Sequence, residues 1–435
     1  MNKQVEVKLE NIRAIKKANI ILDGITVLTG ENGCGKSTVS KLTYHLLKTN
    51  IDYDKIIDKR LKNKLGSIYR ILDSIIIELS DFLDKSDYVK IRHQFRIILK
   101  GDTEIYEMEE SIQFAINFLS DLFNTIVIST PKEKRRLKRI KRIINDSIKL
   151  ENGDADIAES LVKLQSSIND LVGNAYKLKE ARSVSILTET LDNVFYDTQL
   201  PTSYNLHEYG SPIIDNKKLL LLQSVSNIAY IDTPMILGMN FRGDERLHWD
   251  DINVLLKNKI GINTNDTIDS VFKNEMLDGD INREKDDIFN EGFQYKRTDG
   301  RVFNLLECAT GLKSFAILRI LYKNGFLHDK TLLIIDEPEA HLHPQWVVEY
   351  ARLIVLLNKE HGVKFLIASH HPDMISAIKY ISEKEKTSSI LHFYLAEKVD
   401  NSFEYEYRDL GTDIEDIFSS FNIAFDRIDL YGVTE

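Results

Sequence analysis

Cysteine is scarce in this sequence: among its 435 residues only Cys34 and Cys308 are cysteines. Two cysteines are too few for a disulfide framework or for a zinc site with four cysteine ligands. The scarcity fits a reducing cytoplasm. Small residues are common in tight loops of the kind expected around both cysteines, so we assign neither thiol a redox role.

Long apolar runs are missing as well. Runs such as LLLL at residues 219–222 are much shorter than the roughly 18 apolar residues that cross a bilayer. The N-terminal MNKQVEVKLE alternates apolar and polar residues, which is typical of a β-strand and not of the apolar segment of a signal peptide. We therefore expect a cytoplasmic protein that does not span or contact a membrane.

An excess of basic charge is also lacking. The net charge is −10 and the isoelectric point is near 5.7, so any contact with nucleic-acid phosphates would have to come from a local patch. A strongly basic stretch, KEKRRLKRIKR from Lys132 to Arg142, holds eight basic residues in eleven. Such a run is either a solvated helix face or a contact for phosphates or a partner protein. It contains no aromatic residue that would stack on single-stranded bases.

Glycine and proline are rare in the middle of the chain. Residues 51–217 contain long periodic stretches of charged and apolar residues, such as SIYRILDSIIIELSDFLD, which are typical of helices. We predict a mainly helical insertion over these residues. One hairpin is expected within it, at FRIILKGDTEIYEME, turning on Gly101 and Asp102.

Strand signals occur at both ends of the chain. Residues 1–50 indicate two strands, a loop and a helix. Strands return in residues 218–435, with SNIAYIDTP, a hairpin turning at Asp299 and Gly300, TLLIIDEP and VKFLIASHHP. Helices are expected from Lys313 to Lys323 and from Pro344 onward. We predict an α/β fold in which residues 1–50 and 218–435 form one domain, interrupted by the insertion at 51–217.

The sequence GENGCGKS, from Gly30 to Ser37, matches the phosphate-loop pattern G-x-x-x-x-G-K-S and lies between an apolar strand and an amphipathic helix. Backbone NH groups of such a loop and of the helix N-terminus form an anion site. Lys36 is expected to reach the β- and γ-phosphates, Ser37 to bind Mg²⁺, and Thr38 to contact the α-phosphate side. The predicted ATP-binding residues are Gly30, Glu31, Asn32, Gly33, Cys34, Gly35, Lys36, Ser37 and Thr38.

The stretch LLIIDEPE supplies a second motif. Its four apolar residues predict a buried strand that ends at Asp336, whose carboxylate is placed to bind Mg²⁺. Glu337 follows directly and is the candidate catalytic base for the attacking water. Roughly 300 residues separate this motif from the phosphate loop, far more than one compact nucleotide-binding domain needs, which again indicates a large insertion.

The order of these motifs resembles the ABC-type ATPase heads of SMC, RecF and OLD-like proteins. The resemblance covers residues 1–50 and about 300–380 and includes CATGLK, from Cys308 to Lys313, just upstream of the DEPE strand. It implies an ABC-type ATPase head with a mixed sheet. It also implies that ATP and Mg²⁺ are bound between the phosphate loop of one subunit and the signature helix of another, in a head-to-tail dimer at least.

The family signature resembles LSGGEK or LSSGEK, and CATGLK matches it at Gly311 and Lys313. The resemblance places a trans phosphate contact at Ala309, Thr310, Gly311, Lys313 and Ser314. Ala309 stands where the family has serine, so Thr310 or Ser314 is left to supply a hydroxyl group. The alternative is an ordinary helix start with Thr310 as its N-cap.

Histidines follow the second motif in two places. IASHHPDM resembles the T-H-S-P ending of the last head strand in OLD-like ATPases, which implies that His370 is the catalytic switch histidine, although a histidine at a strand end is often structural. His371 stands where the family has serine. His341 and His343 in EAHLHP lack an evident third ligand, so we predict no metal site there. Arg13 matches a basic residue near the nucleotide in SMC-like heads.

The short insertion and the short segment after the last motif resemble stand-alone ATPase subunits of bacterial anti-phage defence systems, PtuA of Septu and AriA of PARIS. About 55 residues follow that motif, too few for the Toprim nuclease domain of full OLD proteins. The resemblance implies an ATPase that acts as sensor and scaffold for a separate, nuclease-like effector. The alternatives are a RecF-like repair ATPase that binds DNA directly and a nucleotide switch without significant turnover.

Overall fold

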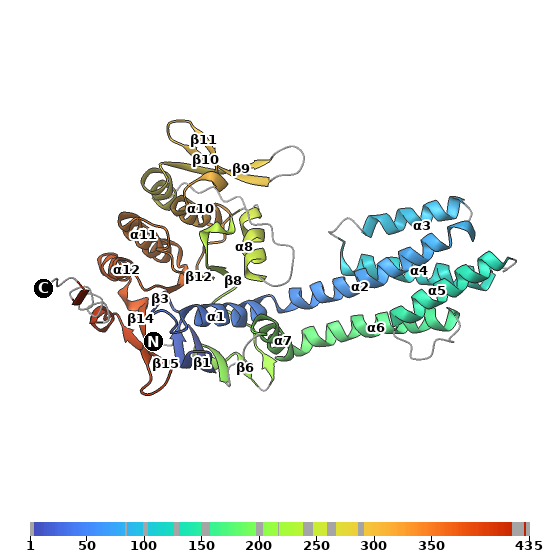
Figure 1. The fold of residues 1–435 in the computed structure, drawn as a ribbon, viewed down its shortest axis with the longest axis horizontal. Helices are drawn as coiled ribbons and strands as arrows, with labels where there is room; N and C mark the ends of the chain where they lie inside the picture. Colours follow the sequence, from blue (N-terminus) through green and yellow to red (C-terminus); the bar gives the residue numbers. More distant parts are fainter. Residues whose placement is uncertain are drawn as a thin grey trace. The chain divides into compact units, whose positions relative to one another are not determined.

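The computed structural model describes residues 4–82, 85–98, 103–125, 130–148, 157–196, 203–215, 217–237, 247–258, 267–285, 291–419 and 430–431. The chain forms two compact units, one of residues Met1–Ile51 with Val184–Glu435 and one of residues Asp52–Ser183 (Figure 1). Among the described residues, no helix is both long and apolar enough to cross a membrane.

A ten-stranded mixed sheet is the centre of the first unit. Its order is β5-β4-β1-β2-β15-β14-β3-β13-β12-β8. The strands are β1 Val5–Ile12, β2 Ile15–Ile21, β3 Ile25–Thr29, β4 Ser203–Glu208, β5 Ser211–Pro212, β8 Asn227–Ile231, β12 Thr331–Asp336, β13 Lys364–Ala368, β14 Leu391–Lys398 and β15 Tyr405–Gly411. Strands β14, β3, β13, β12 and β8 pair in parallel, whereas β1 pairs antiparallel with β2 and β4.

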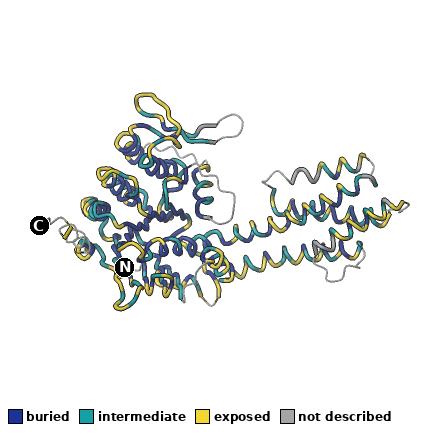
Figure 2. The backbone as a smooth tube through the Cα atoms, viewed as in Figure 1, coloured by how far each residue is buried: buried dark blue, intermediate teal, exposed yellow. Residues whose placement is uncertain are grey.

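The middle of the sheet is buried on both faces. Every residue of β3, β12 and β13 is buried, as expected for parallel strands that are covered by helices on both sides. The helices of this unit are α1 Lys36–Ile51, α7 Ser185–Val194, α8 Leu247–Lys257, α9 Thr267–Ser270, α10 Thr310–Lys323, α11 Pro344–His361 and α12 Pro372–Lys384. Figure 2 shows the same burial along the central strands and the inner sides of these helices.

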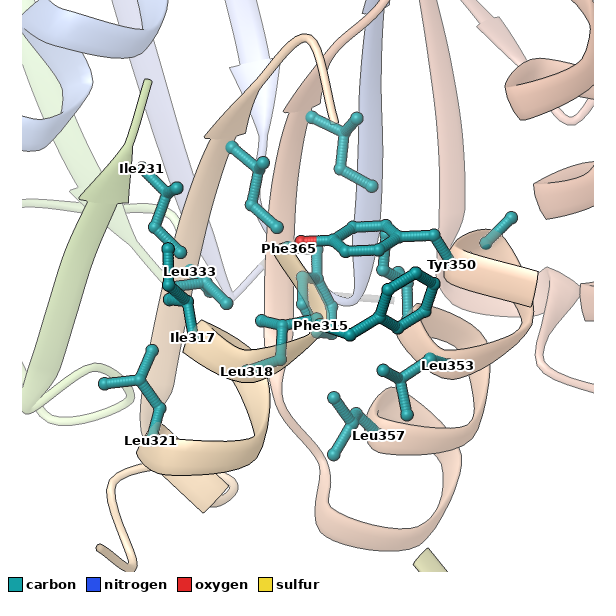
Figure 3. Packing of buried hydrophobic residues seen from close by; sticks show 14 of the residues in the cluster. Ile231, Phe315, Ile317, Leu318, Leu321, Leu333, Tyr350, Leu353, Leu357 and Phe365 are labelled. Carbon is teal, nitrogen blue, oxygen red and sulfur yellow. The ribbon is translucent and has the colours of Figure 1, made fainter. Parts of the chain in front are cut away.

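Aromatic and aliphatic side chains join α10 and α11 to the sheet (Figure 3). Phe315 of α10 meets Tyr350 of α11 edge to face, with ring centroids 5.2 Å apart. Leu353 and Phe365 belong to the same buried cluster. Because α10 and β12 share one core, the helix that carries CATGLK and the strand that ends at Asp336 are held together.

Short elements complete the first unit. The hairpin of β10 and β11 turns at Asp299 and Gly300, as predicted. The short strands are β6 Ile214–Asp215, β7 Lys218–Leu219, β9 Gly279–Lys285, β10 Glu291–Arg297 and β11 Val302–Asn304. Single helical turns lie at Pro234–Ile236, Leu305–Glu307 and Ser388–Ile390, and a π-helix lies at Val271–Met276.

The second unit is helical. Its helices are α2 Tyr53–Glu78, α3 Lys85–Ile98, α4 Ile105–Thr125, α5 Pro131–Ile148 and α6 Ile157–Ala181, with a 3₁₀ turn at Ser80–Phe82. One side of α2 is buried at Ile57, Leu61, Leu65 and Leu72, and α2 packs against α4, α5 and α6. This spacing of apolar residues along one side is typical of helices and confirms the helices predicted for this part of the chain.

The hairpin expected at FRIILKGDTEIYEME is wrong. Its first arm belongs to α3, which runs to Ile98, and its second arm belongs to α4, which starts at Ile105. The turn residues Gly101 and Asp102 themselves lie outside the described residues. A short run of apolar residues fits both the two-residue period of a strand and the 3.6-residue period of a helix. The packing of α3 against α4 stabilises the helical form here.

The helical unit is shorter than the expected insertion at 51–217, because it ends at Ser183. The residues that follow, α7 and β4 to β7, belong to the first unit. Strand β4 pairs antiparallel with β1, from Val5 opposite Glu208 to Glu10 opposite Ser203. Apart from this boundary, the predicted architecture is confirmed: an α/β fold with a mixed sheet and a mainly helical insertion.

Candidate functional site

The phosphate loop lies between β3 and α1, as its sequence predicts. Gly30 and Gly35 have φ values of 140° and 96°, which favour glycine. A Cβ atom on Gly35 would lie 2.7 Å from Ile15 Cγ1, and one on Gly30 would lie 2.9 Å from Cys34 Sγ. Both glycines are therefore required by backbone conformation and by close packing of the loop.

Lys36, the first residue of α1, folds its side chain back over the loop. Its ammonium group donates hydrogen bonds to the carbonyl oxygens of Gly30, at 2.9 Å, and Glu31, at 3.0 Å. The side chain is buried, whereas Ser37 is exposed and Thr38 is buried. The loop thus holds one ammonium group at its centre and presents the Ser37 hydroxyl group at its rim.

Asp336 is buried at the C-terminal end of β12. Its Oδ2 accepts a 2.7 Å hydrogen bond from the hydroxyl group of Tyr230, which lies on the neighbouring strand β8. Its Oδ1 is buried and has no partner with hydrogen-bonding geometry among the described residues. Burial raises the pKa of Asp336 above its ordinary value. The hydroxyl groups of Ser40, Tyr230 and Ser37 act in the opposite direction, which places Ser37 next to this carboxylate.

The pair of Ser37 and Asp336 fits a magnesium ion. Mg²⁺ prefers oxygen ligands and is commonly held by one or two protein oxygens together with substrate phosphates. The structure supplies an unpartnered carboxylate oxygen and an adjacent hydroxyl group, both beside the phosphate loop. No group of three or more His, Cys, Asp or Glu residues that would hold a metal by itself is present in the described part of the chain.

Glu337 follows Asp336 at the edge of the sheet. Its backbone φ of 48° is unusual for a residue with a side chain, and its NH group donates to Ala368 O at 2.8 Å. Unfavourable backbone conformations of this kind often occur at functional sites, where the surrounding structure maintains them. The Glu337 side chain is exposed at the C-terminal end of β12.

His370 lies opposite Glu337, directly after β13. Its Nδ1 is 3.7 Å from Glu337 Oε1 and 3.9 Å from Glu339 Oε1. Strand β13 lies between β3 and β12, so the sheet brings the phosphate loop, Asp336, Glu337 and His370 to one edge. Their proximity matches the sequence expectation, and their catalytic roles remain predictions.

Glu339 was not identified from the sequence. It is buried, and its Oε1 accepts hydrogen bonds from Ser369 Oγ at 2.8 Å and from the backbone NH of His370 at 3.4 Å. Glu339 Oε2 is buried without a hydrogen-bond partner among the described residues. A third acid within DEPE was the available signal, but only the fold shows that this carboxylate fixes the turn that carries His370.

Tyr230 was also missed. It stands in SNIAYIDTP, which the sequence identified only as a strand, and its register opposite Ile334 brings its hydroxyl group to Asp336. Burial and the Asp336 charge raise the pKa of Tyr230 well above its ordinary value, so the phenol remains a proton donor. No local pattern distinguishes such a tyrosine from one that only packs in a core.

The signature helix α10 begins at Thr310, with Ala309 at the N-cap position and no side-chain cap. Thr310 is therefore the first helical residue and not the N-cap, which corrects the alternative interpretation. A Cβ atom on Gly311 would lie 3.0 Å from Leu342 Cδ2 and 3.4 Å from His341 O. Gly311 thus lets the turn after DEPE pack directly on the helix start.

Lys313 and Ser314 are buried in the single chain, whereas Ala309 is exposed. Ser314 lines the same small cavity as Asp336 and Glu337. A larger pocket of about 450 Å³ lies on the other side of the helix start and includes Ala309 and Gly311. The exposed part of the predicted signature is therefore its first turn, around Ala309.

The remaining candidate residues have local structural contacts. His343 and His371 are N-caps of α11 and α12, where their Nδ1 atoms accept from Gln345 NH at 3.4 Å and Asp373 NH at 3.2 Å. Arg13 is exposed, and its guanidinium carbon lies 5.4 Å from the centre of the Phe195 ring.

The chain is similar to several known proteins. The chain is 22% identical over 413 residues to the Old nuclease of Escherichia phage P2, covering 92% of this chain and 62% of that protein. The chain thus spans less than two thirds of its relative. Among solved structures, the Smc head bound to the C-winged helix domain of ScpA matches with a TM-score of 0.41 at 14% identity, covering 95% of this chain and 98% of that one.

The SMC head domain from Thermotoga maritima matches with a TM-score of 0.35 at 11% identity, over 94% of this chain and 99% of that one. The family model described as an AAA ATPase domain matches residues 3–375, which include the phosphate loop, Asp336, Glu337 and His370. The chain therefore belongs to the AAA ATPase domain family.

Proposed function

We propose that this protein binds ATP with Mg²⁺ and hydrolyses it in the cytoplasm. The observation that supports this best is the joining of two distant motifs: Ser37, in the first turn of α1, lies close enough to the buried Asp336 carboxyl to lower its pKa, and Asp336 Oδ1 has no hydrogen-bond partner among the described residues. Glu337 and His370 face each other at the same edge of the sheet.

The chain's own groups account for each step. When ATP enters the loop, Lys36 exchanges its bonds to Gly30 and Glu31 for the β- and γ-phosphates. Ser37 and Asp336 would hold Mg²⁺, which supplies positive charge against the phosphate oxygens. A water molecule then attacks the γ-phosphorus, the bond to the β-phosphate oxygen breaks to release ADP, and Glu337 accepts the proton of the water. We assign to His370, whose Nδ1 lies 3.7 Å from Glu337 Oε1, the contact with the departing phosphate group.

We further propose that two subunits close head to tail around ATP. The first turn of α10, around the exposed Ala309, would meet the ATP held by the partner's phosphate loop. A helix N-terminus with free NH groups is suited to an anionic phosphate. We also propose a place in anti-phage defence, with this chain as sensor and scaffold for a separate, nuclease-like effector. This proposal rests on the resemblance of the sequence motifs to stand-alone defence ATPases, and the similarity to a protein named a nuclease agrees with a nuclease-like partner.

A mixing experiment tests the composite site. Lys36→Ala removes the phosphate contact, and Gly311→Asp puts a negative charge and a clashing side chain at the signature, so each variant alone should lose ATPase activity. Mixing them allows dimers in which one site combines the intact Lys36 of one subunit with the intact Gly311 of the other. Activity should return on mixing. The head-to-tail dimer is contradicted if Gly311→Asp binds ATP, Lys36→Ala does not, and the mixture of the two variants remains inactive.

A further inference from the structure

Helix α5 carries a basic face that the ATP site does not explain. The basic stretch noted in the sequence lies on this helix, Pro131–Ile148. Its exposed basic residues are Lys134, Arg135, Lys138, Arg139 and Arg142. With 3.6 residues per turn, these five positions fall within an arc of about 140° on one side of the helix. The basic residues thus form one continuous surface, here called the α5 basic face.

The opposite side of α5 is apolar and packs against other helices of the helical unit. Leu137 and Ile140 are buried, and α5 packs against α2 and α6 within the helical unit (Figure 1). Because these apolar residues are used in packing, they are not available to enter a lipid surface, as the apolar side of a membrane-binding helix must be. The α5 basic face is therefore a surface of a folded bundle.

Charge is distributed unevenly along the chain. Residues 52–183 contain 24 Lys and Arg against 22 Asp and Glu, a net charge of +2, in a chain whose net charge is −10. Arg139 Nη1 lies 3.5 Å from Glu78 Oε1, but this arginine is mainly exposed. Exposed ion pairs contribute little, so Arg139 can exchange its partner for a phosphate at little cost. Polyanions are thus attracted to the insertion rather than to the acidic remainder.

The length of the face indicates the kind of polyanion. From Lys134 to Arg142 the helix rises about 12 Å, at 1.5 Å per residue. Duplex DNA carries one negative charge per about 1.7 Å of its axis with both strands counted, so a duplex segment of this length holds about seven phosphates, of which part can face the helix. The helix contains no aromatic residue of the kind that stacks on single-stranded bases. We propose that the α5 basic face binds the backbone phosphates of double-stranded DNA, without reading its sequence.

A salt titration with the full-length chain tests this proposal. The probe is a fluorescently labelled duplex of random sequence, and its affinity is measured by anisotropy over a series of salt concentrations. The test variant is Lys134→Glu, Arg135→Glu, Lys138→Glu, with the three Gln substitutions as a milder form. Loss of three phosphate contacts should weaken binding strongly and reduce the slope of log affinity against log salt by about three.

The matched control reverses three exposed basic residues of α2 in the same unit: Lys59→Glu, Arg70→Glu and Lys64→Glu. It has the same net charge as the test variant and should bind duplex DNA much more tightly than that variant. Circular dichroism checks that both keep their helices. Because the proposal does not depend on ATP, Lys36→Ala should bind the duplex as the wild type does, which separates this test from that of the ATPase.

Three outcomes would overturn the proposal. In the first, the wild type would fail to bind the duplex at low salt. In the second, the test and control variants would lose affinity equally, which would show that net charge alone determines binding. In the third, the protein would bind vesicles containing phosphatidylserine through the α5 basic face and leave the duplex unbound. Selective loss of duplex binding in the α5 variant, for both the Glu and the Gln forms, would support it.

Discussion

Tyr230 donates its hydroxyl hydrogen to Asp336, a buried carboxylate that would have to be charged to hold Mg²⁺ as we propose. Burial raises the pKa of Asp336, and a hydrogen bond to the charged form lowers it. Activity that needs the charged carboxylate is therefore present at high pH and is lost as the pH falls through this raised pKa. We therefore expect ATPase activity to be lost at a higher pH than it would be if this aspartate were exposed.

Replacing Tyr230 with Phe removes one donor to the charged carboxylate. The pKa of Asp336 should rise further, and the acid limb of ATPase activity should move to higher pH, with activity retained on the alkaline side. Steady-state ATPase rates over a pH series measure the shift. Tyr380→Phe, at an exposed tyrosine of α12, is the control and should leave the profile unchanged. An identical acid limb in the wild type and the Tyr230 variant would show that this hydrogen bond does not tune Asp336.

Glu339 acts on the site through Ser369 and the backbone of His370. Glu339→Gln keeps the shape of the side chain but weakens the charge-assisted bonds that fix this turn. We expect kcat to fall by about tenfold to a hundredfold, as for misplaced catalytic groups, while KM for ATP changes little. Glu360→Gln, on the exposed side of α11, is the matched control. An equal fall in kcat and rise in KM would instead indicate a disturbed binding loop.

At the scale of elements, the start of α10 and the turn after DEPE form one packed unit. Gly311 permits this contact, because the turn at His341 and Leu342 lies against the helix start. The turn itself follows Glu337, so movement at the edge of the sheet can reach the exposed first turn of α10. The signature and the catalytic strand are thereby linked within one subunit.

Gly311→Ala tests that link with a single methyl group. Its Cβ atom would lie 3.0 Å from Leu342 Cδ2, so the turn has to move by a few tenths of an ångström. We expect ATP-dependent association, measured by analytical ultracentrifugation, to weaken while ATP affinity stays intact. Gly173→Ala in α6, where the added Cβ has no neighbour within 4 Å, is the same substitution without a clash. If both variants associate as strongly as the wild type does, Gly311 does not contribute to the interface.

At the scale of the whole molecule, local motifs predicted the central strands, and the strand order shows why the motifs at their ends meet. The phosphate loop, Asp336 and His370 each follow an apolar run, and parallel strands bring their ends to one edge. The boundary at Ser183 was not predicted, because SYNLHE becomes a strand only by pairing with β1, far away in sequence. The burial of Lys313 and the contacts of Glu339 and Tyr230 depend on tertiary packing in the same way.

In the proposed mechanism, Glu337 accepts the proton of the attacking water in a site that binds ATP through Lys36. The most direct measurement compares ATP affinity and ATP turnover in the wild type and in Glu337→Gln, with Lys36→Ala as the variant that should not bind ATP. We predict that Glu337→Gln binds ATP, hydrolyses it at least about a hundredfold more slowly, and accumulates as an ATP-bound dimer. Hydrolysis by Glu337→Gln at the wild-type rate would contradict the account.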